Sequence, residues 1–221
     1  MAETPNILTP LQRDFLNAFF ARSVAETFFL TGGTALAAFY LHHRYSEDLD
    51  LFTLDHDALD VMEREIPILA AEIGCAWSQK VKATDFRMLL LHRPPEPSLK
   101  IDLVRDAGAQ FGEHSRFGNV VVDSLLNIAV NKVTAVFGRV AAKDFVDLYF
   151  LLQQGFNLDE LMQKAKEKDL GFTEFYFAGS LGEIRRVQDL PRLIKPVTLE
   201  QLRAFYNPLA AQIMRTLKPS D

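Results

Sequence analysis

The sequence predicts an α+β fold, in which a domain of mixed strands and helices (residues 1–122) precedes a helical domain (residues 123–221). Two patterns support this division. Before residue 122, several short segments alternate apolar with polar residues, as half-buried strands do, whereas after it apolar residues recur every three or four positions, as on helix faces. The 221 residues are 48% hydrophobic, which is ample for a core in one large domain or two small ones.

The first 122 residues contain three helical and six strand-like segments. Helices are predicted over 11–25, 34–41 and 58–73, where Pro67 is expected to kink or interrupt the third. Strands are predicted over 28–30, 48–54, 77–83, 86–91, 99–104 and 119–122, and the prolines at 94, 95 and 97 mark a turn. We therefore expect a mixed β-sheet flanked by helices.

The rest of the chain has helical periodicity over 124–137, 142–153, 158–166 and 199–217. A cluster of aromatic residues falls outside these segments and consists of Phe172, Phe175, Tyr176 and Phe177. Such a cluster packs in a core or stacks on nucleic-acid bases, and core packing is the expected role here.

Composition excludes several classes of protein. With one cysteine, Cys75, the chain forms no internal disulfide, and its five histidines lack the spacing of a zinc site. The formal net charge of −5 gives no overall attraction to polyanions, although a local basic patch could bind RNA. No long uncharged apolar run and no basic-then-apolar leader occur, so we expect a cytoplasmic protein without membrane contact.

Two aspartates in the second predicted strand indicate a metal site. Asp48 and Asp50 are two residues apart, so an extended strand places both carboxylates on one face and Leu49 in the core. Paired carboxylates suit Mg²⁺, which completes its coordination shell with water and phosphate oxygens. Taken alone, the same pair could be solvated carboxylates at a strand edge.

A glycine-rich turn precedes these aspartates. Gly32, Gly33 and Thr34 stand between a buried strand and a predicted helix. Backbone N–H groups at such a helix start receive phosphate, so the turn is a candidate phosphate cradle. An ordinary turn is the alternative interpretation.

Asp102 adds a third carboxylate, because Ile101 and Leu103 alternate with it and leave it on the open face with Lys100. If this strand lies beside that of Asp48 and Asp50, the three carboxylates converge. Two metal ions roughly 3.5–4 Å apart could then activate a hydroxyl and neutralise a leaving pyrophosphate, with Asp102 as base or bridging ligand. This is the chemistry of nucleotidyl transfer.

Four blocks, in this order, resemble the AbiEii/AbiGii nucleotidyl transferase toxin family. They are Gly32-Gly33-Thr34-Ala35-Leu36, His43-Arg44-Tyr45-Ser46-Glu47-Asp48-Leu49-Asp50-Leu51-Phe52, Lys100-Ile101-Asp102-Leu103-Val104 and Lys143-Asp144-Phe145-Val146-Asp147-Leu148-Tyr149. The resemblance implies the DNA polymerase β-type nucleotidyltransferase fold and an enzyme that uses an NTP, such as ATP, with Mg²⁺ or Mn²⁺. It also implies the toxin of a bacterial toxin–antitoxin or abortive infection system, with a cognate antitoxin as partner.

The resemblance also implies roles for individual residues. The implied catalytic and metal-binding residues are Asp48, Asp50 and Asp102. The implied nucleotide-binding residues are Gly32, Gly33, Thr34, Lys132, Lys143 and Asp144. For the last three, structural alternatives remain: a lysine that snorkels from an apolar face, an exposed ion pair of Lys143 with Asp147, and a polar surface aspartate.

The expected reaction moves a nucleoside monophosphate from an NTP onto an acceptor hydroxyl. By analogy with the family, tRNA ends are the favoured acceptor and a protein side chain is the next. Two alternatives stay open: a small-molecule nucleotidyltransferase of the antibiotic-modifying kind, and a non-catalytic nucleotide-binding module.

Overall fold

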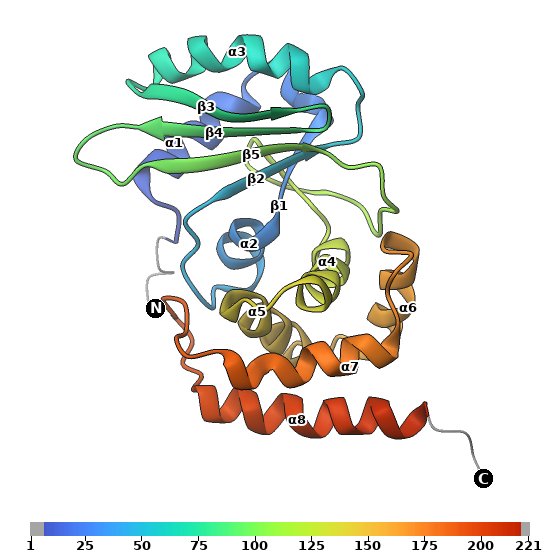
Figure 1. The fold of residues 1–221 in the computed structure, drawn as a ribbon. Coiled ribbons are helices and arrows are strands. Elements are labelled where there is room, and N and C mark those ends of the chain that lie inside the picture. Colours follow the sequence, from blue (N-terminus) through green and yellow to red (C-terminus); the bar gives the residue numbers. More distant parts are fainter. Residues whose placement is uncertain (1–6, 218–221) are drawn as a thin grey trace. The chain divides into compact units, whose positions relative to one another are not determined.

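The computed structural model describes residues 7–217, and the chain divides into two compact units. The first unit, called here the sheet domain, comprises the residues up to Ala107 together with Phe111–Leu125. The second, the helical domain, comprises Gly108–Gln110 and the residues from Leu126 onward. Figure 1 labels the α-helices of both and five strands of the sheet domain. The α+β fold class predicted from the sequence is confirmed.

The sheet domain is built on one seven-stranded mixed sheet with the order β3-β4-β5-β2-β1-β7-β6. Figure 1 labels β1 to β5 of this sheet. The strands are β1 (Phe28–Thr31), β2 (Leu49–Thr53), β3 (Ala76–Ala83), β4 (Phe86–His92), β5 (Leu99–Arg105), β6 (Ser115–Phe117) and β7 (Val120–Val122). β2 runs antiparallel to β1 and parallel to β5, and β1 runs parallel to β7. Six strands occur where periodicity predicts them, whereas the three-residue β6 was not predicted.

The central strands align the predicted acidic residues. Asp50 on β2 is the register partner of Thr31 on β1 and of Asp102 on β5. Leu49, Leu51, Ile101 and Leu103 are fully buried, as the alternation predicts. The strand of Asp102 therefore lies beside the strand of Asp50 in the sheet, as predicted.

Helical segments α1 (Pro10–Phe20), η1 (Ser23–Thr27), α2 (Gly32–Ala35), the π-helical η2 (Leu36–Leu41) and α3 (Ala58–Glu72) complete this domain. A capping box between Thr9 and Gln12 starts α1, which ends earlier than predicted and is followed by the separate turn η1. α3 continues through Pro67, which lies on the solvent side, so the expected interruption is wrong.

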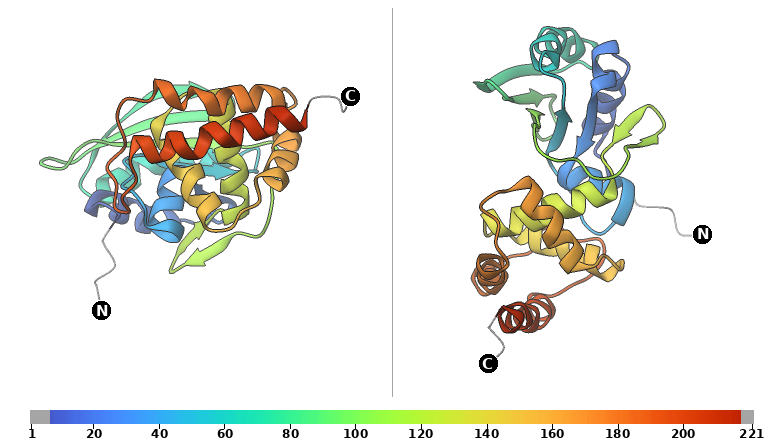
Figure 2. Two further views of the ribbon diagram at one scale, coloured as in Figure 1. Left: turned by 90° about the horizontal axis from the view of Figure 1, so that it is seen from below. Right: turned by 90° about the vertical axis from the view of Figure 1, so that its right-hand side faces the viewer.

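The helical domain contains α4 (Leu125–Gly138), α5 (Ala142–Gln153), α6 (Leu158–Lys168), α7 (Glu174–Gly182), the short η3 (Glu183–Arg186) and α8 (Leu199–Thr216). Both views in Figure 2 show α7 and α8 side by side. α7 was not predicted, and it begins where the Thr173 hydroxyl accepts a hydrogen bond from the Tyr176 N–H. Among the described residues, no helix is long and apolar enough to span a membrane.

Candidate active site

The first glycine of the turn accommodates a catalytic candidate. Gly32 has φ +69°, in the left-handed region that favours glycine. The Asp50 carboxylate lies directly against it: a Cβ at Gly32 would overlap Asp50 Oδ2 and lie 2.9 Å from Asp50 Cγ. The backbone angle and the close approach of Asp50 therefore both require glycine at this position.

The second glycine makes room for a buried cation. A Cβ at Gly33 would lie 2.5 Å from Arg44 Nη2 and 3.1 Å from Ser46 Oγ. Arg44 is buried, and its Nη1 donates to the carbonyl oxygen of Tyr45 at 2.9 Å. The sequence predicts that Gly33 leaves room for a phosphate. The close approach of the Arg44 side chain is a second reason why this position requires glycine. A guanidinium beside a helix start favours anions, although the sequence analysis gave Arg44 no role.

Hydrogen bonds fix the segment that precedes β2. The buried Thr34 hydroxyl donates to the carbonyl oxygen of Asp48 at 2.5 Å. Nε2 of the buried Gln12 donates to the carbonyl oxygens of Ser46 and Glu47 at 2.9 and 3.1 Å. Thr34 thus positions Asp48 beside the helix start, and its contact with a triphosphate stays a prediction.

Lys100 lies between two of the predicted metal ligands. Its Nζ is 2.6 Å from Asp102 Oδ2 and 3.8 Å from Asp48 Oδ2. Burial lowers the pKa of Lys100, but the hydrogen bond to Asp102 and the charges of the aspartates outweigh burial, so the pKa is raised. The site therefore contains a protonated ammonium group that the sequence analysis left without a role.

The three predicted carboxylates do not form a ready-made metal cage. Within residues 7–217, no group of three or more His, Cys, Asp or Glu side chains is arranged so that it could hold a metal ion. Asp102 Oδ1, however, is buried and has no hydrogen-bond partner in that part of the chain. Buried carboxylate oxygens normally have a partner, and hard cations such as Mg²⁺ take oxygen ligands. The donor atoms of the site therefore fit such a cation.

A fourth aspartate adjoins this row. Asp123 directly follows β7, is 1% exposed, and accepts a hydrogen bond from the Thr31 hydroxyl at 2.6 Å. Its backbone N–H donates to the Leu30 carbonyl oxygen at 2.9 Å, and its carbonyl accepts from the Tyr40 hydroxyl at 2.7 Å. Asp123 thus anchors the end of β1, next to Gly32. Asp123 was not predicted as a site residue, and its position directly after the apolar residues of β7 is the sequence feature that could have identified it.

The helical domain contains a separate buried ionic cluster. Lys132 Nζ is 3.0 Å from Asp144 Oδ1 and 2.8 Å from Asp147 Oδ2, and both aspartates are 0% exposed. Arg139 Nε is 2.7 Å from Asp144 Oδ2. Burial raises the pKa of Asp144, but the charges and hydrogen bonds of Lys132 and Arg139 outweigh it and lower the pKa. Asp144 is therefore ionised and internally neutralised.

The contacts of this cluster test the structural alternatives that the sequence left open for Lys132, Lys143 and Asp144. Asp144 is not a surface residue, and Lys132 does not snorkel to solvent, because its side chain is 7% exposed. Asp147 pairs with Lys132 in the interior, while Lys143 is exposed, so the alternative of an exposed ion pair between Lys143 and Asp147 is wrong. Asp147 was not predicted as a member of this cluster, although its spacing of three from Asp144 places both residues on one helix face.

The aromatic cluster divides into two parts. Phe172 and Phe177 are buried and their rings lie 5.3 Å apart, so core packing is correct for them. Phe175 and Tyr176 are 55% and 65% exposed, and their rings lie edge to face at 5.5 Å.

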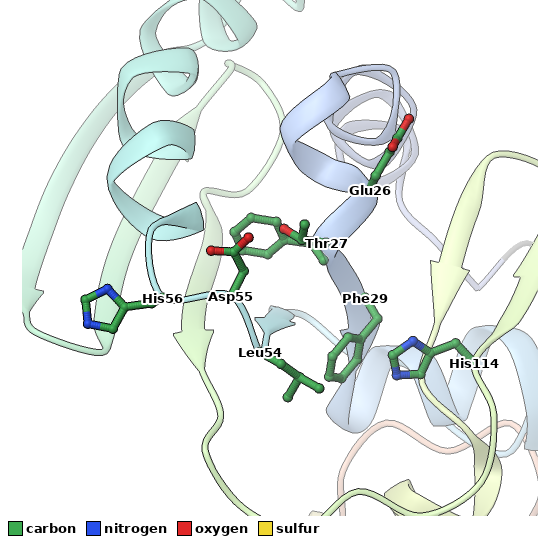
Figure 3. Close-up of a pocket in the computed structure, with 8 residues that line it drawn as sticks. Glu26, Thr27, Phe29, Leu54, Asp55, His56 and His114 are labelled. Atoms are coloured by element: carbon green, nitrogen blue, oxygen red, sulfur yellow. The ribbon is translucent and has the colours of Figure 1, made fainter.

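A pocket of about 480 Å³ opens at the other end of β1, where Phe28 pairs with Thr53 (Figure 3). The His114 ring packs against the Phe29 ring in the pocket lining, with their centroids 4.2 Å apart. Its lining residues are Glu26, Thr27, Phe28, Phe29, Leu54, Asp55, His56 and His114. None of the predicted site residues is among them.

Known proteins share this fold. A candidate nucleotidyltransferase from Helicobacter pylori aligns with TM-score 0.62 at 20% identity, covering 94% of this chain and 93% of its own. MenT4, a nucleotidyltransferase toxin from Mycobacterium tuberculosis H37Rv, aligns with TM-score 0.59 at 15% identity, covering 96% and 84%. An uncharacterized protein of Aquifex aeolicus is 28% identical over 173 residues, which are 71% of this chain and 73% of that protein.

The sequence itself matches a described family over nearly its whole length. Residues 14–219 match the family described as Nucleotidyl transferase AbiEii toxin, Type IV TA system. The match includes the glycine turn, all three predicted catalytic aspartates and the buried cluster of the helical domain. The chain therefore belongs to the AbiEii nucleotidyl transferase toxin family and is a nucleotidyltransferase.

Proposed function

We propose that this toxin-family enzyme moves a nucleoside monophosphate from an NTP onto the hydroxyl of a tRNA end in a Mg²⁺-dependent reaction. The carrying observation is the contact of the Asp50 carboxylate with Gly32, at the start of the helix that follows β1. Asp102 occupies the adjacent register position on β5. The proposal is supported because carboxylates, which suit a divalent cation, lie beside backbone that suits phosphate.

The residues of the sheet domain would divide the work of the reaction. Asp48, Asp50 and Asp102 would hold the cation, and Asp102 would also serve as base or bridging ligand for the attacking hydroxyl. When bound, Mg²⁺ would supply charge neutralisation for the leaving pyrophosphate. Gly32, Gly33 and Thr34 would orient the triphosphate, with the buried Arg44 guanidinium adding positive charge at Gly33. Positioning and electrostatics are the main requirements of such transfers.

In the helical domain, the proposal for Lys132, Lys143 and Asp144 is more limited. Lys132 and Asp144 are internally paired, so they would shape the domain and reach nucleotide only by exchanging these partners. Lys143 is exposed and free of that constraint, and is the better candidate for a phosphate contact.

The family description supports a toxin with a cognate antitoxin, acting in the cytoplasm where NTPs and tRNA occur. A protein side chain is the second acceptor that we consider. Expression of the chain without a partner should slow bacterial growth, and growth should recover when a catalytic aspartate is replaced.

The first test measures label transfer by folded variants. Asp48→Asn and Asp50→Asn are each expected to lose at least about 100-fold in rate, because the charge that stabilises the transition state is reduced. Asp57→Asn is the matched control, since the Asp57 side chain is 88% exposed and lies outside the site. Transfer at the wild-type rate by folded Asp50→Asn would refute the metal-ligand assignment.

The second test identifies the acceptor. Labelled NTPs, Mg²⁺ and total bacterial tRNA should yield labelled RNA, and labelling should fall steeply with salt because RNA contacts release counterions. Label on cell protein alone would favour the protein acceptor. Label on an added aminoglycoside alone would favour the antibiotic-modifying alternative, and no magnesium-dependent turnover with any acceptor would favour the non-catalytic one.

A further inference from the structure

A lysine occupies the space between two of the carboxylates assigned to the metal. Lys100 precedes Asp102 by two residues on β5, so both side chains lie on the same face of the sheet. Nζ contacts Asp102 Oδ2 at 2.6 Å and lies 3.8 Å from Asp48 Oδ2. The ammonium group thus offsets part of the negative charge of the site.

The second oxygen of Asp102 indicates that this arrangement is incomplete. Oδ1 is buried, yet in residues 7–217 no donor reaches it. An ammonium group on one oxygen satisfies only part of what a carboxylate accepts, whereas a metal ion can bridge or bind both oxygens. The Asp102 carboxylate can therefore accept more positive charge than Lys100 supplies.

We propose that Lys100 is the resident cation of the metal-free site, and that it leaves Asp102 when a divalent cation binds. This inference rests on the proposed metal-dependent function. Lys100 remains protonated throughout, so the exchange moves no proton. The freed ammonium is then available to an oxygen of the incoming triphosphate, beside the glycine turn.

The exchange predicts opposite effects on two affinities. A competing cation weakens metal binding, so removing it should tighten binding of the metal alone. The same lysine would attract the triphosphate, so removing it should weaken NTP binding. A lysine that only stabilises the fold would not shift the two affinities in opposite directions.

The structure provides a matched control. Lys82 Nζ lies 2.7 Å from Glu63 Oε1 in the same domain, in an ion pair of nearly the same length that involves none of the site carboxylates. Lys82→Gln therefore removes a comparable charge and contact elsewhere. Lys100→Arg keeps the charge and tests whether charge, rather than side-chain identity, controls metal affinity.

The experiment is titration of the full chain with Mn²⁺, without nucleotide, by calorimetry. Lys100→Gln should bind Mn²⁺ about tenfold or more tightly than wild type, because a like charge at contact distance is removed. Lys82→Gln and Lys100→Arg should stay within about twofold. In the presence of a chelator, Lys100→Gln should have a lower Tm than wild type, because its carboxylates lack a counterion. Mn²⁺ should then raise the Tm of Lys100→Gln by more than it raises the Tm of wild type.

A companion titration with a non-hydrolysable NTP and Mg²⁺ should show weaker binding by Lys100→Gln. Equal or weaker Mn²⁺ affinity of folded Lys100→Gln, with normal binding by wild type, would overturn the inference and leave the proposed function intact. If no variant, wild type included, binds Mn²⁺ at millimolar concentration, the metal-dependent function fails and the inference fails with it.

Discussion

Replacing Gly32 by alanine tests the contact on which the proposed active site rests. Two costs are expected. Forcing φ +69° on a residue with a Cβ costs about 1–2 kcal/mol, and the new Cβ overlaps Asp50 Oδ2 and lies 2.9 Å from Asp50 Cγ. Displacing that carboxylate should add about 1–3 kcal/mol, as in other coupled neighbours. Gly32→Ala should therefore lose about 2–5 kcal/mol of unfolding free energy.

A double-mutant cycle separates the two costs. In the Asp50→Ala background the overlapping atoms are gone, so Gly32→Ala should cost only the backbone strain of about 1–2 kcal/mol. Gly74→Ala is the matched control, because Gly74 has φ +68° and a Cβ there would meet nothing within 4 Å. Urea denaturation measures all four variants. Equal costs of Gly32→Ala with and without the Asp50 carboxylate would refute the close contact.

Three further outcomes are expected. Lys132→Met should lower the free energy of unfolding, measured in urea, by about 3–5 kcal/mol, because it leaves buried carboxylates without a counterion. Lys166→Met removes a lysine from a surface ion pair and should lower it by about 1 kcal/mol or less. Equal losses in the two variants would contradict the argument from burial. The folded-state pKa of Asp144 is lowered, so the ionised carboxylate stabilises the fold above its unfolded-state pKa of about 3.9, and this stabilisation is lost as pH falls through the folded-state pKa. Asp144→Asn should therefore reduce the slope of unfolding free energy against pH below about pH 4. An unchanged slope would exclude this carboxylate as the cause. Gly33→Val should displace the Arg44 guanidinium and weaken NTP binding in calorimetry with Mg²⁺, and unchanged affinity in the folded variant would leave Gly33 a purely structural turn.

Periodicity predicted the two strands that carry Asp50 and Asp102, because β2 and β5 each have one buried and one open face. Leu49 and Leu51 alternate with Asp50 over enough residues to define strand β2, and β5 has the same pattern. The three residues of β6 are too few to define a period. α7 contains adjacent aromatic residues without a regular apolar stripe, so its helical state follows from packing and from the Thr173 cap.

The side-chain contacts of the site were not predictable from the pattern. Sequence spacing places Lys100 and Asp102 on one face, but the rotamer and the position of the neighbouring segment decide that Lys100 Nζ approaches Asp48 as well. Likewise, the partners of Asp144 lie twelve and five residues away, and only the packing of the α4 and α5 region brings them together. Such contacts depend on tertiary structure that a local period does not contain.

Lys100 and Lys132 each pair with a cluster of aspartates, and the difference in their burial separates an exchangeable cation from a fixed one. The side chain of Lys100 is 33% exposed, and those of Asp102 and Asp48 are 14% and 36% exposed, so water can solvate the ammonium as it leaves. The side chain of Lys132 is 7% exposed between two aspartates that are 0% exposed, and its departure would leave buried charges unpaired. Salt screens exposed pairs far more than buried ones. High salt should therefore weaken the hold of Lys100 on its carboxylates while leaving the Lys132 cluster intact, which makes the sheet-domain lysine the one suited to yield to a metal ion.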